Sequence, residues 1–493
     1  MSPQAAPQSL TQQAAHGVKW TTTSMVVVTL LQFAQLAVLA RLLSKADFGL
    51  MAMISVLLAI GLAYADMGLS NALIWRQDAT RNQLSSLYWV NILAGLGVFV
   101  VTLAFAPLLA ALFRQPRLEI YLPWAALVFV LLPWGQEFQV LLQKELRFRI
   151  LAMIEIAAAT VGTVTAILAA LAGLGVFALI AGLLAGAGTR AAGLAVVGWK
   201  RWRPILRLRF GDLRGYMRFG LYQMGERSLN ELTANIDYLV VGRFLGSVAL
   251  GLYSVAYQLV VFPFQRINPV LTRVAFPVFS LRRDDDEAVG KGFCQLSEML
   301  VFLVFPLLVG LLVTAPVMVP VLFGRKWVGA APLVQVLSLM AMMKTLGNPV
   351  GAVLLSRGRA GLGFLMTAVE VGLILVVFLV AVHFGTLAVA WAWVGISLVS
   401  FAVWQPVVLR VIHLAVRDYL RALARPMLLT ALLGLSLEAV YLSLRNVVGS
   451  SLVLLGLLVA AGIVIHLGIW LLFDRRFVAY TYAMLRAARG SAT

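Results

Sequence analysis

The chain has 493 residues, of which 62% are hydrophobic and only 12% charged, with a net charge of +19 and a mean hydropathy of +0.95. This composition excludes an ordinary water-soluble domain, which keeps far more polar surface. In a soluble protein the basic balance would suggest nucleic acid. Here, charges that flank membrane spans and contact lipid headgroups explain it better. We expect membrane lipids as partners and no nucleic acid.

Long apolar runs separated by short charged segments predict an all-α polytopic membrane protein with about fourteen transmembrane helices. Helices are expected because lipid offers backbone groups no hydrogen-bond partner, and the runs are too long for barrel strands. The predicted spans are 18–41, 48–70, 84–112, 119–142, 150–172, 174–199, 213–243, 249–280, 294–316, 328–356, 360–383, 386–413, 425–444 and 451–473.

The polar ends of the chain predict two tails. Residues 1–17 are polar and are expected to be disordered, and no cleavable signal peptide is evident because the first apolar run is long enough to stay in the bilayer. Residues 474–493 form the second tail. Cys294 is the only cysteine, so an internal disulfide is excluded.

Lysine and arginine alternate between the two sides of the predicted spans. The even-numbered gaps and the C-terminal tail hold about 25 of these cations and the odd-numbered gaps about 8. This positive-inside bias predicts that both termini are cytoplasmic. The location in the bacterial inner membrane is implied by the family resemblance that is described below.

Three short segments recur in the same order, offset by a little over 200 residues. The paired segments are 41–50 (RLLSKADFGL) with 243–252 (RFLGSVALGL), 107–113 (PLLAALF) with 316–323 (PVMVPVLF), and 141–147 (LLQKELR) with 354–359 (LLSRGR). An even number of helices per repeat predicts two parallel-related lobes, 18–199 and 213–413, with 425–473 as an addition. Two such lobes suggest alternating access around a central cavity.

Enzyme motifs are missing from the sequence. There is no GxxxxGK[ST] phosphate loop and no HExxH, and the four histidines are far apart. The acidic run 284–286 resembles motifs of sugar-nucleotide transferases, but beside Arg282 and Arg283 a solvated loop is the better interpretation. We therefore expect no enzyme activity, no cofactor and no metal site.

Ionisable residues inside spans are informative because a charge in hydrocarbon is costly and must face a cavity or a partner. The cationic candidates for a substrate cavity are Arg190, Arg227, Arg266, Arg273 and Lys344. The acidic candidates for ion coupling or ion pairing are Asp66, Glu137, Glu155, Glu231 and Asp237. A purely structural ion pair remains an alternative for these residues.

Local patterns refine some of these candidates. Arg227 and Glu231 are four residues apart and can pair on one helix face. Arg266 and Arg273 share a face in a span that we expect Pro263, Pro269 and Pro277 to interrupt, and freed amides beside arginines suit phosphate. Alternatively, Arg273 reaches the headgroups from a helix end. The glycine pair Gly182 and Gly186 before Arg190 indicates helix packing.

Four segments carry a resemblance to a known family. They are 65–76 (ADMGLSNALIWR), 235–259 (NIDYLVVGRFLGSVALGLYSVAYQL), 263–280 (PFQRINPVLTRVAFPVFS) and 322–339 (LFGRKWVGAAPLVQVLSL). They resemble the polysaccharide exporters called Wzx flippases, in particular the branch that includes colanic acid exporters. The resemblance covers about residues 15–475.

The resemblance implies the fold of the multidrug/oligosaccharidyl-lipid/polysaccharide exporter superfamily, with two six-helix lobes in a V shape and two extra helices. It also implies the cargo, an undecaprenyl-diphosphate-linked repeat unit moved to the periplasmic leaflet for lipopolysaccharide, capsule or exopolysaccharide synthesis. Polymerase and export machinery would be natural partners. Without an ATP site, energy would come from an ion gradient or from mass action.

Other functions remain open at this point. A multidrug or small-molecule antiporter would use the same fold, and Asp66 and Glu137 would serve as its coupling acids. A membrane glycosyltransferase or polymerase usually needs a large outside loop, and the loops predicted here are short. A peptidoglycan-precursor flippase would share the architecture, so the sequence alone does not choose the headgroup.

Overall fold

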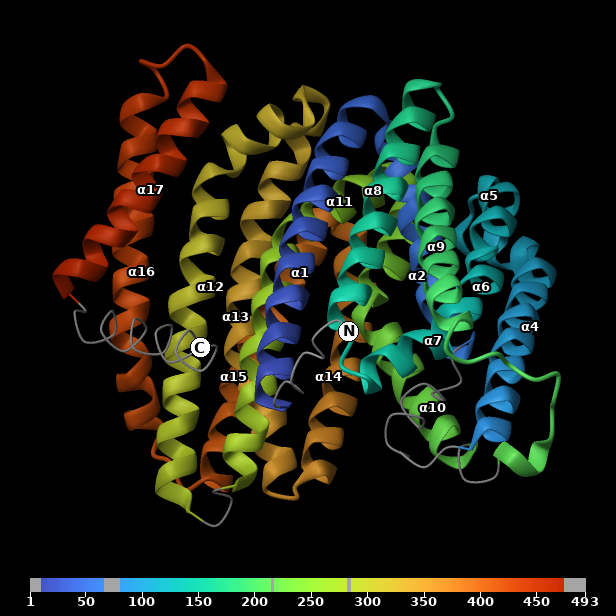
Figure 1. Cartoon of the computed structure of the whole chain (residues 1–493). Helices are drawn as coiled ribbons and strands as arrows, with labels where there is room; N and C mark the ends of the chain where they lie inside the picture. The colour runs from blue at the N-terminus through green and yellow to red at the C-terminus, as the bar shows by residue number, and fades with distance from the viewer. Residues whose placement is uncertain (1–9, 66–79, 214–216, 282–284, 474–493) are drawn as a thin grey trace, which may run out of the picture. The chain divides into compact units, whose positions relative to one another are not determined.

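The computed structural model describes residues 10–65, 80–213, 217–281 and 285–473, without the side chains of some helix residues, 262–281 among them. All regular structure in these ranges is helical (Figure 1). The described residues divide into two compact units, one ending at Val248 and the other beginning at Ala249.

The described residues of the first unit form the helices α1 to α10, a 3-10 turn and the start of α11. These elements are α1 (Leu10–Leu42), α2 (Lys45–Ala65), α4 (Arg81–Phe113), α5 (Arg117–Ala126), α6 (Val128–Leu131), α7 (Pro133–Lys144), α8 (Phe148–Leu171), α9 (Val176–Trp199), η1 (Phe210–Leu213), α10 (Met217–Ala234) and α11 (Ile236–Leu281). A cluster of Tyr88, Phe138, Leu142 and Leu194 packs α4, α7 and α9 together.

The second unit takes the rest of α11 and the helices that follow. These are α12 (Asp286–Phe323), η2 (Arg325–Ala330), α13 (Ala331–Ser356), α14 (Ala360–Ala381), η3 (Val382–Phe384), α15 (Thr386–Val411), α16 (Val416–Leu444) and α17 (Ser451–Phe473). Val313, Val317, Leu437, Leu454 and Leu458 form a core cluster between α12, α16 and α17.

Thirteen helices of the described residues are long and apolar enough to cross a membrane. They follow the predicted spans in order, which confirms the all-helical polytopic class. The difference from fourteen arises where 213–243 and 249–280 were predicted, because a single candidate span, Ile236–Val261, is found there. In this segment the backbone of α11 leaves helical geometry at Gly246, with φ 80° and ψ −177°, between the two predicted spans.

The predicted interruption of α11 at its prolines is wrong. The helix continues through Pro263, Pro269 and Pro277 to Leu281. A proline removes one backbone hydrogen bond and kinks a helix, but neighbouring groups in a membrane protein often compensate for the lost bond. The positive φ of Gly246 interrupts the helix because it lies outside the helical region altogether.

The three repeated segments fall on matching helix ends. In the first pair, Ser44 lies between α1 and α2, and Gly246 takes the aligned position. In the second pair, α4 ends before Arg114 with φ 52° and α12 ends before Gly324 with φ 94°.

The third pair repeats this feature after α7 and α13. Leu146 has φ 54° and the aligned Gly358 has φ 67°, and each is followed by the arginine that precedes the next helix, Arg147 or Arg359. Left-handed residues are uncommon outside glycine. Their recurrence at aligned positions therefore supports a true internal repeat.

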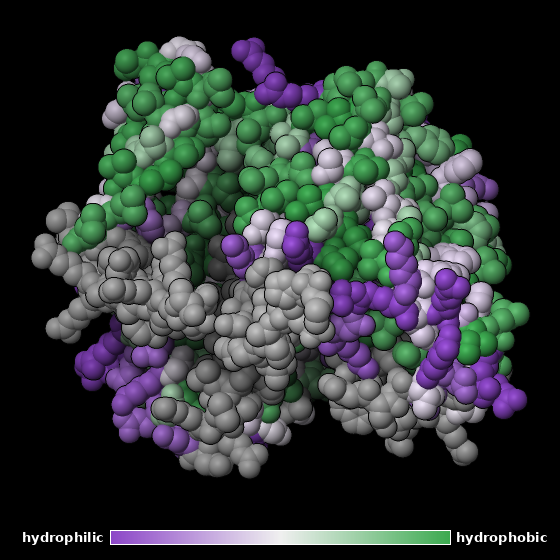
Figure 2. All heavy atoms as spheres, in the orientation of Figure 1, coloured by the Kyte–Doolittle hydropathy of each residue, from purple (hydrophilic) through white to green (hydrophobic). Residues whose placement is uncertain are grey.

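Much of the helix surface is apolar. Large side chains such as Leu30, Leu168 and Leu435 are more than half exposed, and Figure 2 shows hydrophobic residues over most of the visible described helices. Such a surface would be a liability in water and is expected for helices in contact with lipid.

Candidate functional site

Two neighbouring cavities lie within the first unit. One has a volume of about 380 Å³ and is lined from α2, α6, α7, α9 and α10. The other has a volume of about 460 Å³ and is lined from α1, α2, α6, α8 and α9. Leu62, Leu132 and Arg190 line both cavities. Arg190 is therefore the charged group common to the two spaces.

Close packing of α8 against α9 positions Arg190. A Cβ atom added to Gly182 would lie 2.6 Å from Ala166 Cβ, and one added to Gly162 would lie 2.9 Å from the Gly182 carbonyl oxygen. Small residues let two helices approach in this way. The glycine pattern before Arg190 thus has the packing role expected for it, and it brings the following turns of α9 beside α8.

Arg190 has two polar partners at this helix contact. Its Nη2 lies 2.9 Å from Glu155 Oε1 of α8 and donates a hydrogen bond of 3.1 Å to Gln139 Oε1 of α7. The Arg190 and Glu155 side chains are 35% and 38% exposed. The pair is thus open to an incoming ligand, and a guanidinium in this position suits a phosphate or carboxylate.

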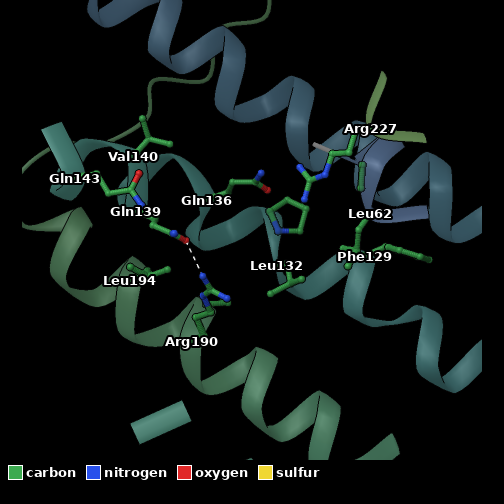
Figure 3. A pocket seen from close by; sticks show the side chains of 13 residues that line it. Leu62, Phe129, Leu132, Gln136, Gln139, Val140, Gln143, Arg190, Leu194 and Arg227 are labelled. Atoms are coloured by element: carbon green, nitrogen blue, oxygen red, sulfur yellow. Dashed lines mark hydrogen bonds between the residues drawn. The ribbon is translucent and has the colours of Figure 1, made fainter. Parts of the chain in front are cut away.

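Arg227 contributes a second cation to the first cavity. It comes from α10 and lines the cavity together with Arg190 and Gln136. Figure 3 shows the side chains of Arg190 and Arg227 entering the cavity from different helices. The expected pair between Arg227 and Glu231 stays a prediction.

Glutamine amides complete the lining. Gln136, Gln139 and Gln143 follow one face of α7 in the first cavity, and Gln32 and Gln35 come from α1 in the second. Thr163 Oγ1 donates a 2.9 Å hydrogen bond to Gln35 Oε1. Amides both donate and accept hydrogen bonds, so this lining suits a ligand rich in hydroxyl groups.

The α7 glutamines are functional candidates that sequence reasoning missed. Their spacing of three and four residues inside a predicted span was the available signal, since it places Gln136, Gln139 and Gln143 on one helix face. Gln32 and Gln35 give the same signal, because their spacing of three residues places them on one face of the first predicted span.

Glu137 points away from this lining. It is 2% exposed and accepts a hydrogen bond from Asn91 Nδ2 of α4, which is 1% exposed. Burial of a carboxyl group in a helix contact requires such partners. Glu137 is thus part of the packing between α4 and α7, and its predicted role in ion coupling stays a prediction.

Asp237 and Glu231 also lie in the first unit. Asp237 is fully buried near the start of α11, where its Oδ1 accepts a 2.9 Å hydrogen bond from the Tyr238 amide. Glu231 is half-buried in α10, and its backbone carbonyl accepts a bond from Asn235 Nδ2. Neither residue lines the two cavities.

Lys344 lies in the second unit on α13. Its Nζ atom is 3.6 Å from the ring centroid of Trp393 on α15, and it interacts electrostatically with Glu370 of α14. Lys344 is half-buried, and a cation–π contact of this kind stabilises its ammonium group. The structure therefore gives Lys344 a packing role, and its predicted role in substrate binding is untested.

The remaining predicted site residues are not described in full. Arg266 and Arg273 fall in α11, in a stretch whose side chains lie outside the described part of the chain. Asp66 also lies outside the described residues. Of the ten candidates, the structure brings together Arg190, Glu155 and Arg227.

Comparison with known proteins identifies relatives over nearly the whole chain. Residues 38–332 match the model of a family described as "Polysaccharide biosynthesis protein". The chain is 34% identical to the teichuronic acid biosynthesis protein TuaB of Bacillus subtilis (strain 168), over 93% of this chain and 95% of that one. It is 32% identical to the lipopolysaccharide biosynthesis protein WzxC of Escherichia coli (strain K12), over 72% of both chains.

A solved structure shares the fold. The lipid II flippase MurJ in an inward closed conformation superposes with a TM-score of 0.73 over 94% of this chain and 99% of that chain, at 11% sequence identity. The predicted resemblance to Wzx-type exporters is confirmed by these matches. The chain belongs to the polysaccharide biosynthesis protein family.

Proposed function

We propose that the protein is a flippase that moves undecaprenyl-diphosphate-linked oligosaccharide units from the cytoplasmic to the periplasmic leaflet for cell-surface polysaccharide synthesis. Family membership supports the polysaccharide pathway, and relatives carry names such as lipopolysaccharide biosynthesis protein. The observation that carries the transport step is Arg190, a cation common to two cavities inside a bundle of membrane helices.

The lining of these cavities offers partners for both parts of such a headgroup, the diphosphate and the sugars. Arg190 and Arg227 would bind the diphosphate, because guanidinium groups match phosphate oxygens in charge and geometry. The glutamines of α7 and α1 would donate and accept hydrogen bonds with sugar hydroxyls. The prenyl chain would stay in lipid, against the apolar helix surface.

Glu155 would act as the counter-ion of Arg190 while no substrate is bound. A cation left alone in a membrane-spanning bundle is costly, and the 2.9 Å contact with Glu155 provides its neutralisation. An arriving diphosphate would replace this carboxylate, and the carboxylate would return when the substrate leaves. Release of the diphosphate from Arg190 would then cost less free energy than release from an arginine without a counter-ion.

We further propose that the protein resides in the bacterial inner membrane with both termini in the cytoplasm. A polymerase and export machinery would be its partners. Residues 18–199 and 213–413 would form the two lobes that alternate access, with 425–473 as an addition. The protein would work as a transporter without chemical catalysis.

Deletion of the gene, followed by complementation, tests the proposal. We expect surface polysaccharide to fall and undecaprenyl-linked oligosaccharide to accumulate in extracted lipid. The native gene should restore both pools. R190Q should fail to do so at equal protein level, because a charge-assisted contact worth about 1.5–3 kcal/mol is lost. R190K should restore them in part.

The outcomes separate the competing functions. Unchanged lipid pools with altered drug sensitivity would contradict the proposal and favour a small-molecule antiporter on the same fold. Full complementation by R190Q would leave the flippase in place but remove Arg190 from its substrate site.

A further inference from the structure

The connection between α9 and η1 is an extended segment rich in arginine. Residues 200–209 (KRWRPILRLR), here named the basic strap, combine cations with apolar residues in near alternation. The five cations of the strap are Lys200, Arg201, Arg203, Arg207 and Arg209. Figure 1 shows this strap as the green connection that leaves α9 and passes towards α4. Sequence reasoning used these cations to orient the protein and expected lipid contacts for the basic residues in general, without distinguishing this segment.

Four hydrogen bonds fix the backbone of the strap to the first turns of α4. They run from Trp89 Nε1 to the Ile205 carbonyl (2.9 Å), from the Ile205 amide to Ser85 Oγ (3.1 Å), from Ser86 Oγ to the Arg207 carbonyl (3.4 Å) and from the Arg209 amide to Ser86 Oγ (3.3 Å). Ser85 and Ser86 are fully buried. The strap is therefore held in one place on the helix ends, unlike a solvated loop.

One side of the strap faces the protein. The ring of Trp202 lies 6.0 Å from that of Tyr88 and 5.8 Å from that of Phe138, measured between centroids. Arg201 forms an ion pair with Glu145 at the end of α7. These contacts join the strap to the core cluster of α4, α7 and α9.

The other side of the strap is exposed and has two kinds of side chain. Leu206 is 87% exposed, and Ile205 and Leu208 are more than 40% exposed. Lys200, Arg203 and Arg209 are also exposed. Figure 2 shows hydrophilic side chains gathered at the lower right, where Figure 1 draws this connection. The strap thus presents cations on a fixed backbone around a protruding leucine.

The position of the strap places this side at the membrane surface. The strap follows directly on the last residue of α9 and is bonded to the beginning of α4, and both helices are candidate membrane spans. The ends of membrane-spanning helices lie at the level of the lipid headgroups. An exposed leucine beside cations there favours a lipid bilayer over an acidic polypeptide.

We propose that the basic strap binds the headgroups of anionic phospholipids of the adjoining leaflet, with Leu206 inserted at the acyl boundary. Each basic residue near an anionic membrane surface contributes roughly a fivefold gain in association. The fixed backbone adds to this effect, because the chain that carries the cations needs no ordering when the lipids bind. The strap would anchor the beginning of α4 and the end of α9 to the bilayer.

Fluorescence quenching by brominated lipids tests the proposal directly. Because Cys294 is the only cysteine, the variant C294S with L206C carries a single site for an apolar fluorophore. The labelled protein is reconstituted in phosphatidylcholine bilayers that contain either brominated phosphatidylglycerol or brominated phosphatidylcholine. We expect stronger quenching by the phosphatidylglycerol, and a smaller difference at high salt.

Matched variants separate strap binding from a general effect of charge. The triple variant K200Q, R203Q and R209Q should lose most of the preference for phosphatidylglycerol over phosphatidylcholine. Each cation removed should lower the association with the anionic lipid roughly fivefold. R410Q, R417Q and R421Q together remove three exposed cations of the second unit and should leave the preference intact. Equal quenching by both lipids with the native strap, or a full preference in the strap variant, would overturn the proposal. Equal quenching would leave a polypeptide as the partner of this surface.

Discussion

Arg190 illustrates how a single intramembrane charge is accommodated. The guanidinium group has Glu155 at 2.9 Å and Gln139 at 3.1 Å, on two different helices. A partly exposed ion pair of this kind is weak evidence for stability, because solvent screening and the cost of desolvation offset the attraction. Its position at the boundary of two cavities is better explained by ligand binding, for which the pair keeps the arginine ready in a fixed orientation.

If the diphosphate replaces the Glu155 carboxylate beside Arg190, removal of that carboxylate has a testable effect. In E155Q the arginine loses its internal carboxylate, so an isoprenyl diphosphate should bind about tenfold more tightly, since one charged competitor is removed. Turnover in flipping should fall, because release becomes harder. Equilibrium binding of undecaprenyl diphosphate to purified protein and flipping in proteoliposomes would measure the two effects.

Two further variants make this result specific. E119Q removes an exposed carboxylate near the start of α5 and should change neither quantity. In R190Q the added E155Q substitution should give no gain in affinity, because the two residues act as one unit. Weaker or unchanged binding in E155Q would contradict the counter-ion role without touching the proposed flippase function, which the lipid pools test.

At the scale of elements, capping side chains at the helix ends determine where several helices begin. Thr80 starts α4 with a capping box to Gln83, and Asp285 caps α12 through the Ala288 amide. Side chains that accept the first free amides of a helix fix where it begins. Ser44 and Asp47 exchange similar bonds at the start of α2.

The close approach of Gly49, near the start of α2, to the backbone of Ser247 gives a prediction. A Cβ atom there would lie 1.7 Å from the Ser247 carbonyl oxygen, next to the interruption at Gly246. G49A should therefore displace backbone and lower stability by about 1–3 kcal/mol. The apparent unfolding temperature in detergent measures this.

Gly97 provides the matched control. It also lies inside a helix, α4, but an added Cβ would meet nothing within 4 Å. G97A should leave the unfolding temperature unchanged or raise it slightly, since alanine is the better helix former. Equal behaviour of G49A and G97A would contradict the close packing of α2 against the segment after Gly246.

At the scale of the whole molecule, the distribution of cations predicts the orientation. About 25 lysines and arginines fall on one side of the predicted spans and about 8 on the other. A reporter enzyme active only in the periplasm should therefore be silent when fused at Thr493 and active when inserted at Gly449, between α16 and α17. Because one predicted span separates the two positions, equal activity at both would contradict the topology.

The sequence by itself determined the class, the family and, for the described residues, the order of the spans and their number to within one. Apolar runs suffice for this, because each helix satisfies its own backbone in lipid without help from its neighbours. The repeated segments were noticed in the sequence, and the structure adds that they lie at helix ends with positive-φ residues such as Gly358.

Only the tertiary structure decided which charges meet. A helix that is apolar all round gives no sign of which face is buried, so nothing in the sequence distinguished Glu137, bonded to Asn91, from Glu155, bonded to Arg190. The glutamines of α7 became a cavity lining, and residues 200–209 a fixed strap, through contacts with segments distant in the chain. Such contacts depend on how helices pack side by side, and hydropathy does not record that.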